Sequence, residues 1–282
     1  MFKNLNPGAL GHALPFDQTC TLARRYNFSG VDLDLSFLGQ MVQTQSLQAA
    51  KEWFSGTGLR AGAFGLNVSW REKDTERTYA ESLARLINDT RLAIEFGCTR
   101  CTTYLMPRSD QLPYREHFTL LERRLRPVAD ILKAYGVWLG LEFVGPWTLR
   151  QGHRYDFIHT MDGLRALAAA IGTGNVGLLL DAFHWYTSHG TLDEIESLPA
   201  EEVVYVHVND ARSGRSADEQ IDGERDLVGA TGVIDIAGFF GALKHIGYDG
   251  PVTVEPFSEA VRKMTPEQAI AATSSALDQT MS

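Results

Sequence analysis

The sequence predicts an α/β protein, a (β/α)₈ TIM barrel built as a single domain over residues 1–282. Strand-like and helix-like apolar patterns alternate along the whole chain, with no linker and no block of like charges between them. Eight strand–helix units follow one another in this way. In the second half, four strand-like segments each end in a carboxylate or an imidazole, and a parallel barrel collects such ends at one mouth.

The predicted strands are short apolar runs, and several of them follow a glycine that ends a helical pattern. Such glycines stand at Gly97, Gly136, Gly172 and Gly247. The strands are expected at residues 5–10, 30–35, 59–66, 100–105, 137–143, 176–181, 203–208 and 251–255.

The predicted helices have apolar residues at intervals of three and four. They are expected at residues 16–26, 45–54, 75–96, 114–135, 160–171, 192–198, 236–246 and 266–277. Two long connections interrupt the rhythm, at residues 144–156 after the fifth strand and 211–233 after the seventh. Long loops at the carboxyl ends of barrel strands usually cover an active site, so both connections are expected there.

The composition excludes several classes of partner. A net charge of −9 and a pI near 5.4 argue against binding to nucleic acid or to an anionic membrane. No apolar run approaches the roughly 20 residues of a membrane span, and the N-terminus lacks a secretory signal. Three cysteines fit a reducing compartment, and we expect a cytoplasmic protein. Cys98 and Cys101 have redox or zinc spacing but no further ligands, which favours two buried thiols.

The four polar strand ends are Glu142, Asp181, His207 and Glu255. They follow one another at intervals of 39, 26 and 48 residues, each long enough for one crossover helix. Two glutamates, one aspartate and one histidine suit a divalent cation that prefers oxygen with some nitrogen. We therefore predict that these four side chains bind one divalent metal ion.

The two glutamates also suggest a reaction. If both bind the metal, each keeps a second oxygen that can take or give a proton, so Glu142 and Glu255 are predicted to form an acid–base pair. The metal would polarise a neighbouring carbonyl and stabilise an enediolate. The alternatives are a salt bridge at the barrel rim for either glutamate and helix capping for Asp181.

Other polar and aromatic residues near the predicted strand ends remain open to two interpretations. His184 would bind substrate, but it could also be a ligand or a packed side chain. Asp210 would orient His207 or cap a loop. Trp147 would stack on a sugar or pack on the rim. Arginines of the seventh connection could reach an anion or a hydroxyl, and the sequence does not rank Arg212, Arg215 and Arg225.

The motifs that contain these residues resemble a known superfamily. They are Leu-Glu142-Phe, Asp181-Ala-Phe-His184, His207-Val-Asn-Asp210 and the closing run at residues 247–257. Together they are similar to the sugar isomerase/epimerase superfamily of xylose isomerase-like barrels, over nearly the full length. The resemblance to its keto-sugar epimerases implies Glu142, Asp181, His207 and Glu255 as ligands of Mn²⁺, with Mg²⁺, Co²⁺ or Zn²⁺ as alternatives. It also implies Glu142 and Glu255 as the acid–base pair, and His184 and Arg212 as substrate contacts.

The same superfamily contains endonucleases of the endonuclease IV type, which hold three zinc ions with additional histidines. This chain lacks those histidines after the second and third strands. In the seventh connection, Asp222-Gly-Glu224-Arg225-Asp226 stands where Asp-x-His would be needed. Together with the acidic composition, this disfavours DNA repair.

The leading hypothesis is a divalent-metal-dependent isomerase or epimerase that moves a proton next to the carbonyl of a small ketose or polyol ketone. The alternative is a lyase or dehydratase of the same superfamily, acting on a keto-inositol, a dehydroshikimate-like ring or a keto-glycoside, because that chemistry also begins with α-proton abstraction. A noncatalytic sugar-binding barrel is disfavoured by the complete ligand set. An unphosphorylated substrate is preferred, and a homodimer or homotetramer is compatible with the sequence.

Overall fold

The computed structural model describes residues 1–281, in which the main sheet consists of parallel strands only. Its strand order is β3-β2-β1-β11-β10-β9-β7-β5-β4. The strands are β1 Phe2–Leu5, β2 Gly30–Val31, β3 Arg60–Ala61, β4 Phe64–Gly65, β5 Arg100–Tyr104, β7 Trp138–Glu142, β9 Val176–Asp181, β10 Val203–Val208 and β11 Pro251–Val254.

The two ends of this strand order meet in one segment of the chain. β3 pairs with β2, β4 pairs with β5, and only Gly62 and Ala63 separate β3 from β4. A side chain at Gly62 would collide with Asn4 and Asp32, so this interruption requires a glycine. β3 and β4 are therefore two parts of the third barrel strand, and the predicted (β/α)₈ barrel is confirmed.

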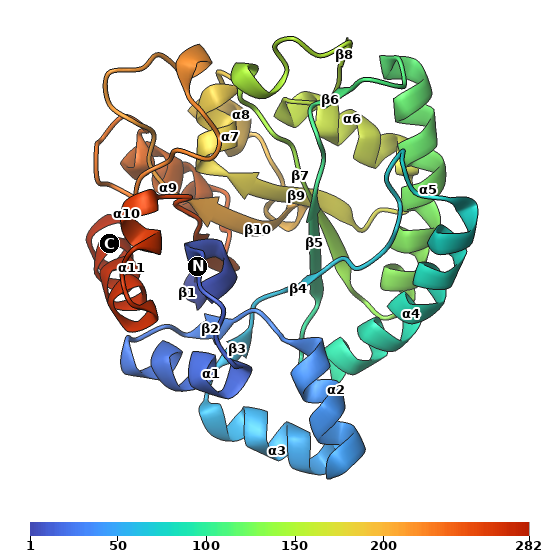
Figure 1. The fold of residues 1–282 in the computed structure, drawn as a ribbon, viewed down its shortest axis with the longest axis vertical. Helices are drawn as coiled ribbons and strands as arrows, with labels where there is room; N and C mark the ends of the chain where they lie inside the picture. The colour runs from blue at the N-terminus through green and yellow to red at the C-terminus, as the bar shows by residue number, and fades with distance from the viewer. Residues whose placement is uncertain (282) are drawn as a thin grey trace.

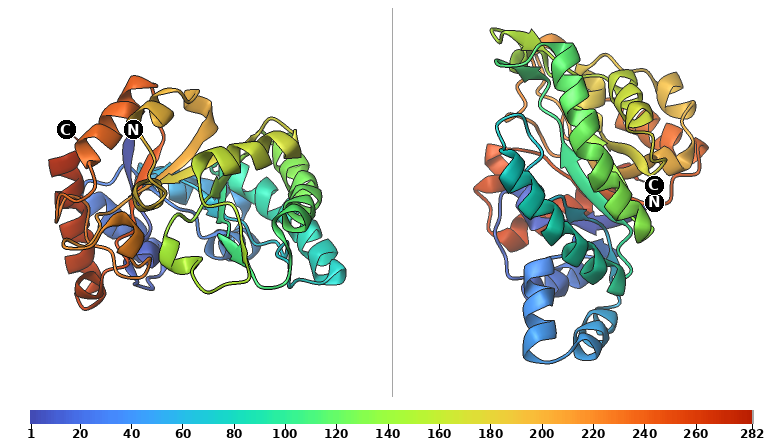
Figure 2. Two further views of the ribbon diagram at one scale, coloured as in Figure 1. Left: turned by 90° about the horizontal axis from the view of Figure 1, so that it is seen from above. Right: turned by 90° about the vertical axis from the view of Figure 1, so that its right-hand side faces the viewer.

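Helices surround the strands on all sides (Figure 1). Figure 2 shows α4 and α5 side by side along one flank. The helices are α1 Phe16–Arg25, α2 Leu35–Thr44, α3 Leu47–Thr57, α4 Glu76–Glu95, α5 Tyr114–Ala134, α6 Met161–Ile171, α7 Ala182–Thr187, α8 Leu192–Glu196, α9 Ile236–His245, α10 Glu259–Arg262 and α11 Pro266–Thr280.

In the first two units, the strands end earlier than predicted, because a side chain just after each strand caps the start of a helix. β1 ends at Leu5, and the side chain of Asn6 accepts the N–H groups of Gly8 and Ala9 to begin a 3₁₀ helix over Pro7–Leu10. The predicted strand at 30–35 likewise stops at Val31. Asp34 caps α2 by accepting the Phe37 N–H, and α2 is a helix that the sequence analysis missed.

The sixth unit contains two helices where one was predicted. α7 begins directly after β9, and Asp181 is its N-cap. α8 follows, started by a capping box between Thr191 and Glu194. α7 was missed because its 6 residues are too few to show a helical period, although a helix cap at Asp181 was one of the alternatives.

The two long connections meet above the carboxyl ends of the strands, as predicted. The 3₁₀ segment Trp147–Leu149 lies against the 3₁₀ segment Ala217–Glu219, and the hydroxyl of Thr148 donates to the Gln220 carbonyl at 2.8 Å. A short antiparallel pair, β6 Arg108–Ser109 with β8 Tyr155–Asp156, ties the first of these connections to the loop after β5.

Two further expectations concern the cysteines and membrane association. Cys98 and Cys101 are both free and fully buried, which confirms two buried thiols. Within residues 1–281, no helix is both long and apolar enough to cross a membrane.

Candidate metal centre

Four strand ends converge at one side of the barrel mouth. Glu142 is the last residue of β7, Asp181 the last of β9, His207 the fifth residue of β10, and Glu255 follows β11 directly. The parallel register places His207 beside Asp181 and beside Thr253. One ligand atom from each of the four lies within 4.8 Å of the others.

The imidazole of His207 lies at the centre of the three carboxylates. Its Nδ1 is 3.2 Å from Glu142 Oε1, 3.6 Å from Glu255 Oε2 and 3.7 Å from Asp181 Oδ2. Glu142, Asp181 and His207 are buried, and Glu255 is nearly so. Three carboxylates and one imidazole facing a common point are a ligand set that fits a divalent cation, so these residues satisfy the chemistry predicted for them.

The crowding changes the pKa values of these groups. Burial raises the pKa of Glu142 to about 7, with the neighbouring carboxylates adding to the effect. Burial also raises the pKa of Glu255. For His207, burial alone would lower the pKa, but the charges of Glu255 and Glu142 raise it to about 10. In the metal-free protein, a protonated His207 therefore supplies positive charge among the carboxylates.

Asp181 serves the helix and the cluster at the same time. Its Oδ1 accepts the N–H groups of Phe183 at 2.6 Å and His184 at 3.4 Å, which caps α7, while its Oδ2 faces His207. Burial alone would raise its pKa, but Arg225 and the nearby histidines hold it well below the usual range. The two interpretations of Asp181, cap and ligand, are therefore compatible with each other.

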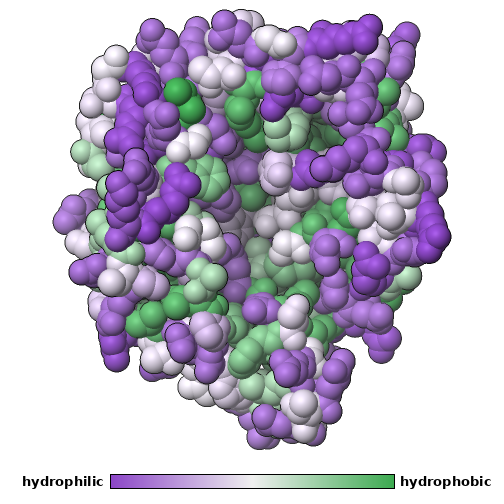
Figure 3. Space-filling model, in the orientation of Figure 1, coloured by the Kyte–Doolittle hydropathy of each residue, from purple (hydrophilic) through white to green (hydrophobic). Residues whose placement is uncertain are grey.

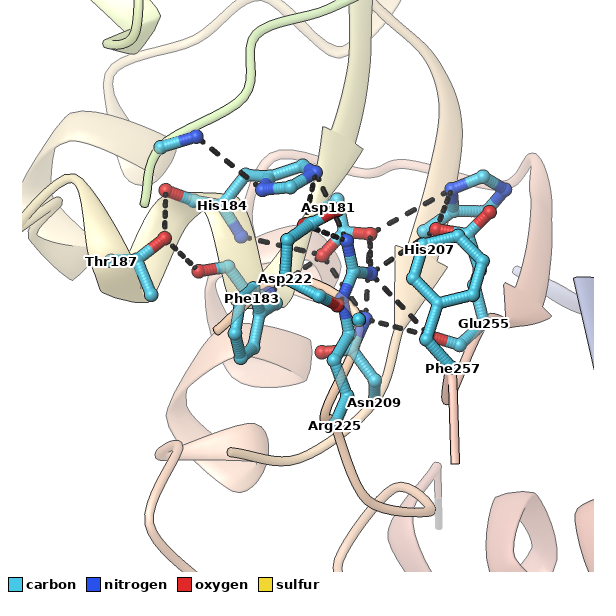
Figure 4. Close-up of polar contacts among 12 residues, drawn as sticks. Asp181, Phe183, His184, Thr187, His207, Asn209, Asp222, Arg225, Glu255 and Phe257 are labelled. Carbon is cyan, nitrogen blue, oxygen red and sulfur yellow. Dashed lines mark hydrogen bonds and ion pairs between the residues drawn. The ribbon is translucent and has the colours of Figure 1, made fainter. Parts of the chain in front are cut away.

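Arg225 is the arginine of the connection after β10 that reaches the cluster, which the sequence analysis could not rank. It is fully buried, and its Nη1 lies 2.9 Å from Asp181 Oδ2 and 3.1 Å from Glu255 Oε2. Its Nη2 lies 2.7 Å from Asp222 Oδ1. The guanidinium lies between the rings of Phe183 and Phe257, 4.6 Å from each ring centre (Figure 4).

A second missed residue is Asn209, whose side-chain amide donates to Asp181 Oδ1 at 3.1 Å and to the Glu255 carbonyl at 3.2 Å. Asn209 stands two residues after His207, and in an extended segment such side chains point to the same side. This spacing was the signal that could have identified Asn209. The suggestion that Asp210 orients His207 is wrong. The Asp210 carboxylate instead accepts backbone N–H groups from the loop at Thr231, Gly232 and Ile234.

His184 lies beside the cluster. Its Nδ1 accepts the Gly145 N–H at 3.4 Å, which leaves the ring proton of the neutral imidazole on Nε2, 3.2 Å from Arg225 Nη2 and 3.8 Å from Asp222 Oδ1. Burial, together with the charge of Arg225, lowers the pKa of His184 to about 4. The imidazole is therefore neutral at physiological pH and available for hydrogen bonding.

The structure does not place Arg212 or Trp147 in the cluster. Arg212 is 39% exposed and pairs with Asp226 at 3.1 Å on the rim. The arginine that contacts the clustered carboxylates is Arg225. Trp147 is 40% exposed, and the Arg150 guanidinium lies 4.9 Å from its ring centre.

Comparison with known proteins establishes the family. The family model described as "Xylose isomerase-like TIM barrel" matches residues 20–280. The chain belongs to this family. The resemblance inferred from the motifs is thereby confirmed.

Curated relatives of this family member are enzymes. An inosose isomerase of Bacillus velezensis is 23% identical over 257 residues, which is 90% of this chain and 87% of the relative. A ketose 3-epimerase of Arthrobacter globiformis is 31% identical over 48% of this chain and 40% of its own. A 3-dehydroshikimate dehydratase of Pseudomonas aeruginosa is 28% identical over 51% of this chain and 21% of its own.

Solved structures share the fold over the whole chain. A xylose isomerase domain protein from Alicyclobacillus acidocaldarius has a TM-score of 0.89 and 31% identity, covering 100% of this chain and 98% of that one. A structure of the IolI protein with a bound zinc atom has a TM-score of 0.81 and 20% identity, covering 100% of this chain and 98% of that one.

Proposed function

We propose that this protein is a divalent-metal-dependent isomerase or epimerase that moves a proton next to the carbonyl of a ketose or polyol ketone. One observation carries the proposal. Glu142 Oε1 faces His207 and Glu255 Oε2 faces His207 and Arg225, while within residues 1–281 the other carboxylate oxygen of each makes no hydrogen bond. Each glutamate therefore has one oxygen for the ion and one for a proton.

Glu142, Asp181, His207 and Glu255 would hold the ion, with Mn²⁺ as our first choice and Mg²⁺, Co²⁺ or Zn²⁺ as alternatives. A bound divalent ion would supply positive charge to the carbonyl oxygen as negative charge develops there. Asn209 donates a hydrogen bond to the Asp181 carboxylate, and Arg225 donates to the carboxylates of Asp181 and Glu255. These contacts would hold the two carboxylates in position for the ion.

In this proposal, one glutamate removes the proton from the carbon next to the carbonyl, which produces an enediolate, and the other returns a proton from its own side. His184 lies at the edge of the cluster and would contact a substrate oxygen, while Arg225 stays paired with the carboxylates. Return of the proton to the opposite face gives an epimer, and its return to the neighbouring carbon moves the carbonyl.

A lyase is the second candidate, supported by the relative named as a 3-dehydroshikimate dehydratase. Elimination also starts with removal of an α-proton, so the same glutamates would serve it. The product separates the two reactions, because elimination gives an enone or releases a leaving group.

The test is metal analysis of the purified protein, combined with deuterium uptake from heavy water into a panel of ketoses and inososes, with and without chelator. About one equivalent of metal per chain and chelator-sensitive exchange into one substrate are expected. Three zinc ions per chain, or a protein that stays metal-free after reconstitution, would overturn the proposal.

A further inference from the structure

One arginine at the barrel mouth is held by aromatic rings and not by an acid. Arg71 lies in the connection between β4 and α4 and is partly buried. Its guanidinium carbon lies 4.6 Å from the ring centre of Trp70 and 4.3 Å from that of Tyr104. Among residues 1–281, its side chain makes no hydrogen bond and no ion pair. The two rings therefore hold the cation and leave its five N–H groups free.

The acids next to Arg71 in the chain are engaged elsewhere. Glu72 accepts the Ser109 hydroxyl at 2.6 Å. The Asp74 carboxylate accepts the backbone N–H of Arg71 at 2.8 Å, which leaves the guanidinium of that residue unpaired. The connection after β4 thus uses its own carboxylates to fix the loop, and the charge of Arg71 remains available to a ligand.

The backbone around Arg71 is fixed as well. The buried guanidinium of Arg124 donates to the Arg71 carbonyl at 2.5 Å and to the Asp74 carbonyl at 2.9 Å. Together with the bond from the Arg71 N–H, these contacts hold the loop on both sides of the residue. A cation that is already positioned loses little freedom when a ligand binds, so the arrangement suits recognition of an anion.

Tyr104 connects Arg71 to the metal centre. It is the last residue of β5 and pairs in register with Glu142, and the Leu105 N–H donates to the Glu142 carbonyl at 2.8 Å. Side chains alternate along a strand, so Tyr104 points to the same side as Thr102, which lines a cavity at the mouth. Figure 3 shows this face of the molecule hollowed near its centre. The exposed ring of Tyr104 therefore lies between a candidate acid–base residue and an unpaired cation.

The geometry of a guanidinium selects the chemical class of ligand. Its N–H groups form a planar fork that matches two oxygens of a carboxylate or a phosphate. Arg225 cannot take this part, because Asp181, Asp222 and Glu255 already engage it. Arg71 has no such partner and stands one strand away from Glu142.

We propose that Arg71 binds a carboxylate or phosphate group of the substrate while the carbonyl end of the same molecule lies at the metal centre. This inference rests on the proposed function and narrows its substrate class. It favours ketones that carry an anionic group over neutral ketoses and inososes. Glu142 would act on the carbon next to the carbonyl, and Arg71 would hold the opposite end of the molecule.

The first test measures equilibrium binding by the protein loaded with Mg²⁺. Ligand-observed NMR compares two matched pairs, fructose with fructose 6-phosphate and an inosose with 3-dehydroshikimate. The anionic member of at least one pair should bind about 10- to 100-fold tighter, because charge-assisted hydrogen bonds are the stronger ones. The pair that shows the preference identifies the anion as a phosphate or a carboxylate. No preference in either pair would overturn the inference.

Variants then test whether Arg71 causes the preference. Arg71→Gln should reduce it to less than about 3-fold at unchanged metal content and unfolding temperature, by weakening binding of the anion alone. Arg71→Lys keeps the charge without the fork and should retain part of the preference. Arg77→Gln removes a cation that is 86% exposed and pairs with Glu81 on α4, so this matched control should change nothing. A preference that survives in Arg71→Gln would assign the anion to the metal or to another cation and overturn the inference.

The proposed function and this inference fail in distinguishable ways. Deuterium exchange confined to neutral ketoses or inososes would overturn the inference and leave the proton-transfer function intact. Arg71-dependent binding of an anionic ketone without exchange into any substrate would support the inference and overturn the proposed function.

Discussion

Arg225 Nη1 lies 2.9 Å from Asp181 Oδ2, and both side chains are excluded from solvent, with 1% and 0% of their surface exposed. The same nitrogen reaches Glu255 at 3.1 Å. Ion pairs at this depth are weakly screened, so the guanidinium supplies much of the charge that allows carboxylates to gather at the barrel mouth. A bound divalent ion would also supply positive charge to these carboxylates.

Arg225→Met should therefore destabilise the metal-free protein by about 3–5 kcal/mol, because it leaves buried carboxylates without a partner. The loss should be smaller with metal bound, since the ion neutralises the same oxygens. Urea unfolding in chelator and in excess Mn²⁺ measures both values. Arg212→Met, at an exposed pair on the rim, is the control and should change the free energy of unfolding by less than about 1 kcal/mol. An equal loss with and without metal would contradict this view of Arg225.

Glu142→Gln and Glu255→Gln should each reduce proton exchange by about 10²- to 10⁴-fold, because an amide cannot act as the acid or the base. Each keeps an oxygen for the ion, so metal content should fall less than in His207→Ala, which removes the central nitrogen ligand. Metal analysis and exchange rates on the same preparations test this. Complete loss of metal in all three variants would leave the glutamates without a demonstrated catalytic role.

Metal binding should release protons. The pKa of His207 in the metal-free protein is raised to about 10 and that of Glu142 to about 7, so near neutral pH the ion must displace the His207 proton and part of the Glu142 proton. Metal affinity should therefore weaken as pH falls, by about a factor of ten per pH unit for each proton displaced. Calorimetric titrations in buffers of different ionisation enthalpy count the protons. An affinity independent of pH between 6 and 8 would show that these groups are not the ligands.

Gly145→Ala should disturb the position of His184. A Cβ at this residue would collide with the His184 carbonyl and lie 2.7 Å from the Thr187 hydroxyl, so a loss of about 1–3 kcal/mol is expected. KM should rise as well if His184 contacts the substrate. Gly241→Ala, in α9 with no neighbouring atom within 4 Å, is the matched control and should stabilise the protein by up to about 1 kcal/mol. Thermal unfolding and steady-state kinetics distinguish the two variants.

The polar strand ends were predictable because each lies at the end of a continuous apolar run. Leu-Leu-Leu-Asp181 and Val-Tyr-Val-His207 are local signals of a buried parallel strand that ends in a polar side chain. The parallel barrel then requires all such ends to meet at one mouth, so the cluster of Glu142, Asp181, His207 and Glu255 follows from topology. No comparable local signal announced α2, whose start depends on the cap at Asp34.

Arg225 could not be ranked because a loop residue has no periodic neighbours from which its direction can be read. It lies 44 residues from Asp181 and 30 from Glu255, and its contacts depend on how the whole connection after β10 folds back over the mouth. The resemblance to keto-sugar epimerases implied Arg212, which is nearer to His207 in the chain, as the substrate contact, although its side chain lies on the rim. Proximity in sequence does not fix orientation outside regular elements.

The sequence by itself determined the barrel and the four residues of the candidate metal centre, because apolar periodicity is a local property and parallel topology converts it into a shared mouth. Only the tertiary structure decided which arginine neutralises the carboxylates. That outcome depends on the path of the connection after β10, which brings Arg225 to Asp181 and Glu255. Contacts of that kind have no periodicity along the chain, so they become visible only when the chain is folded.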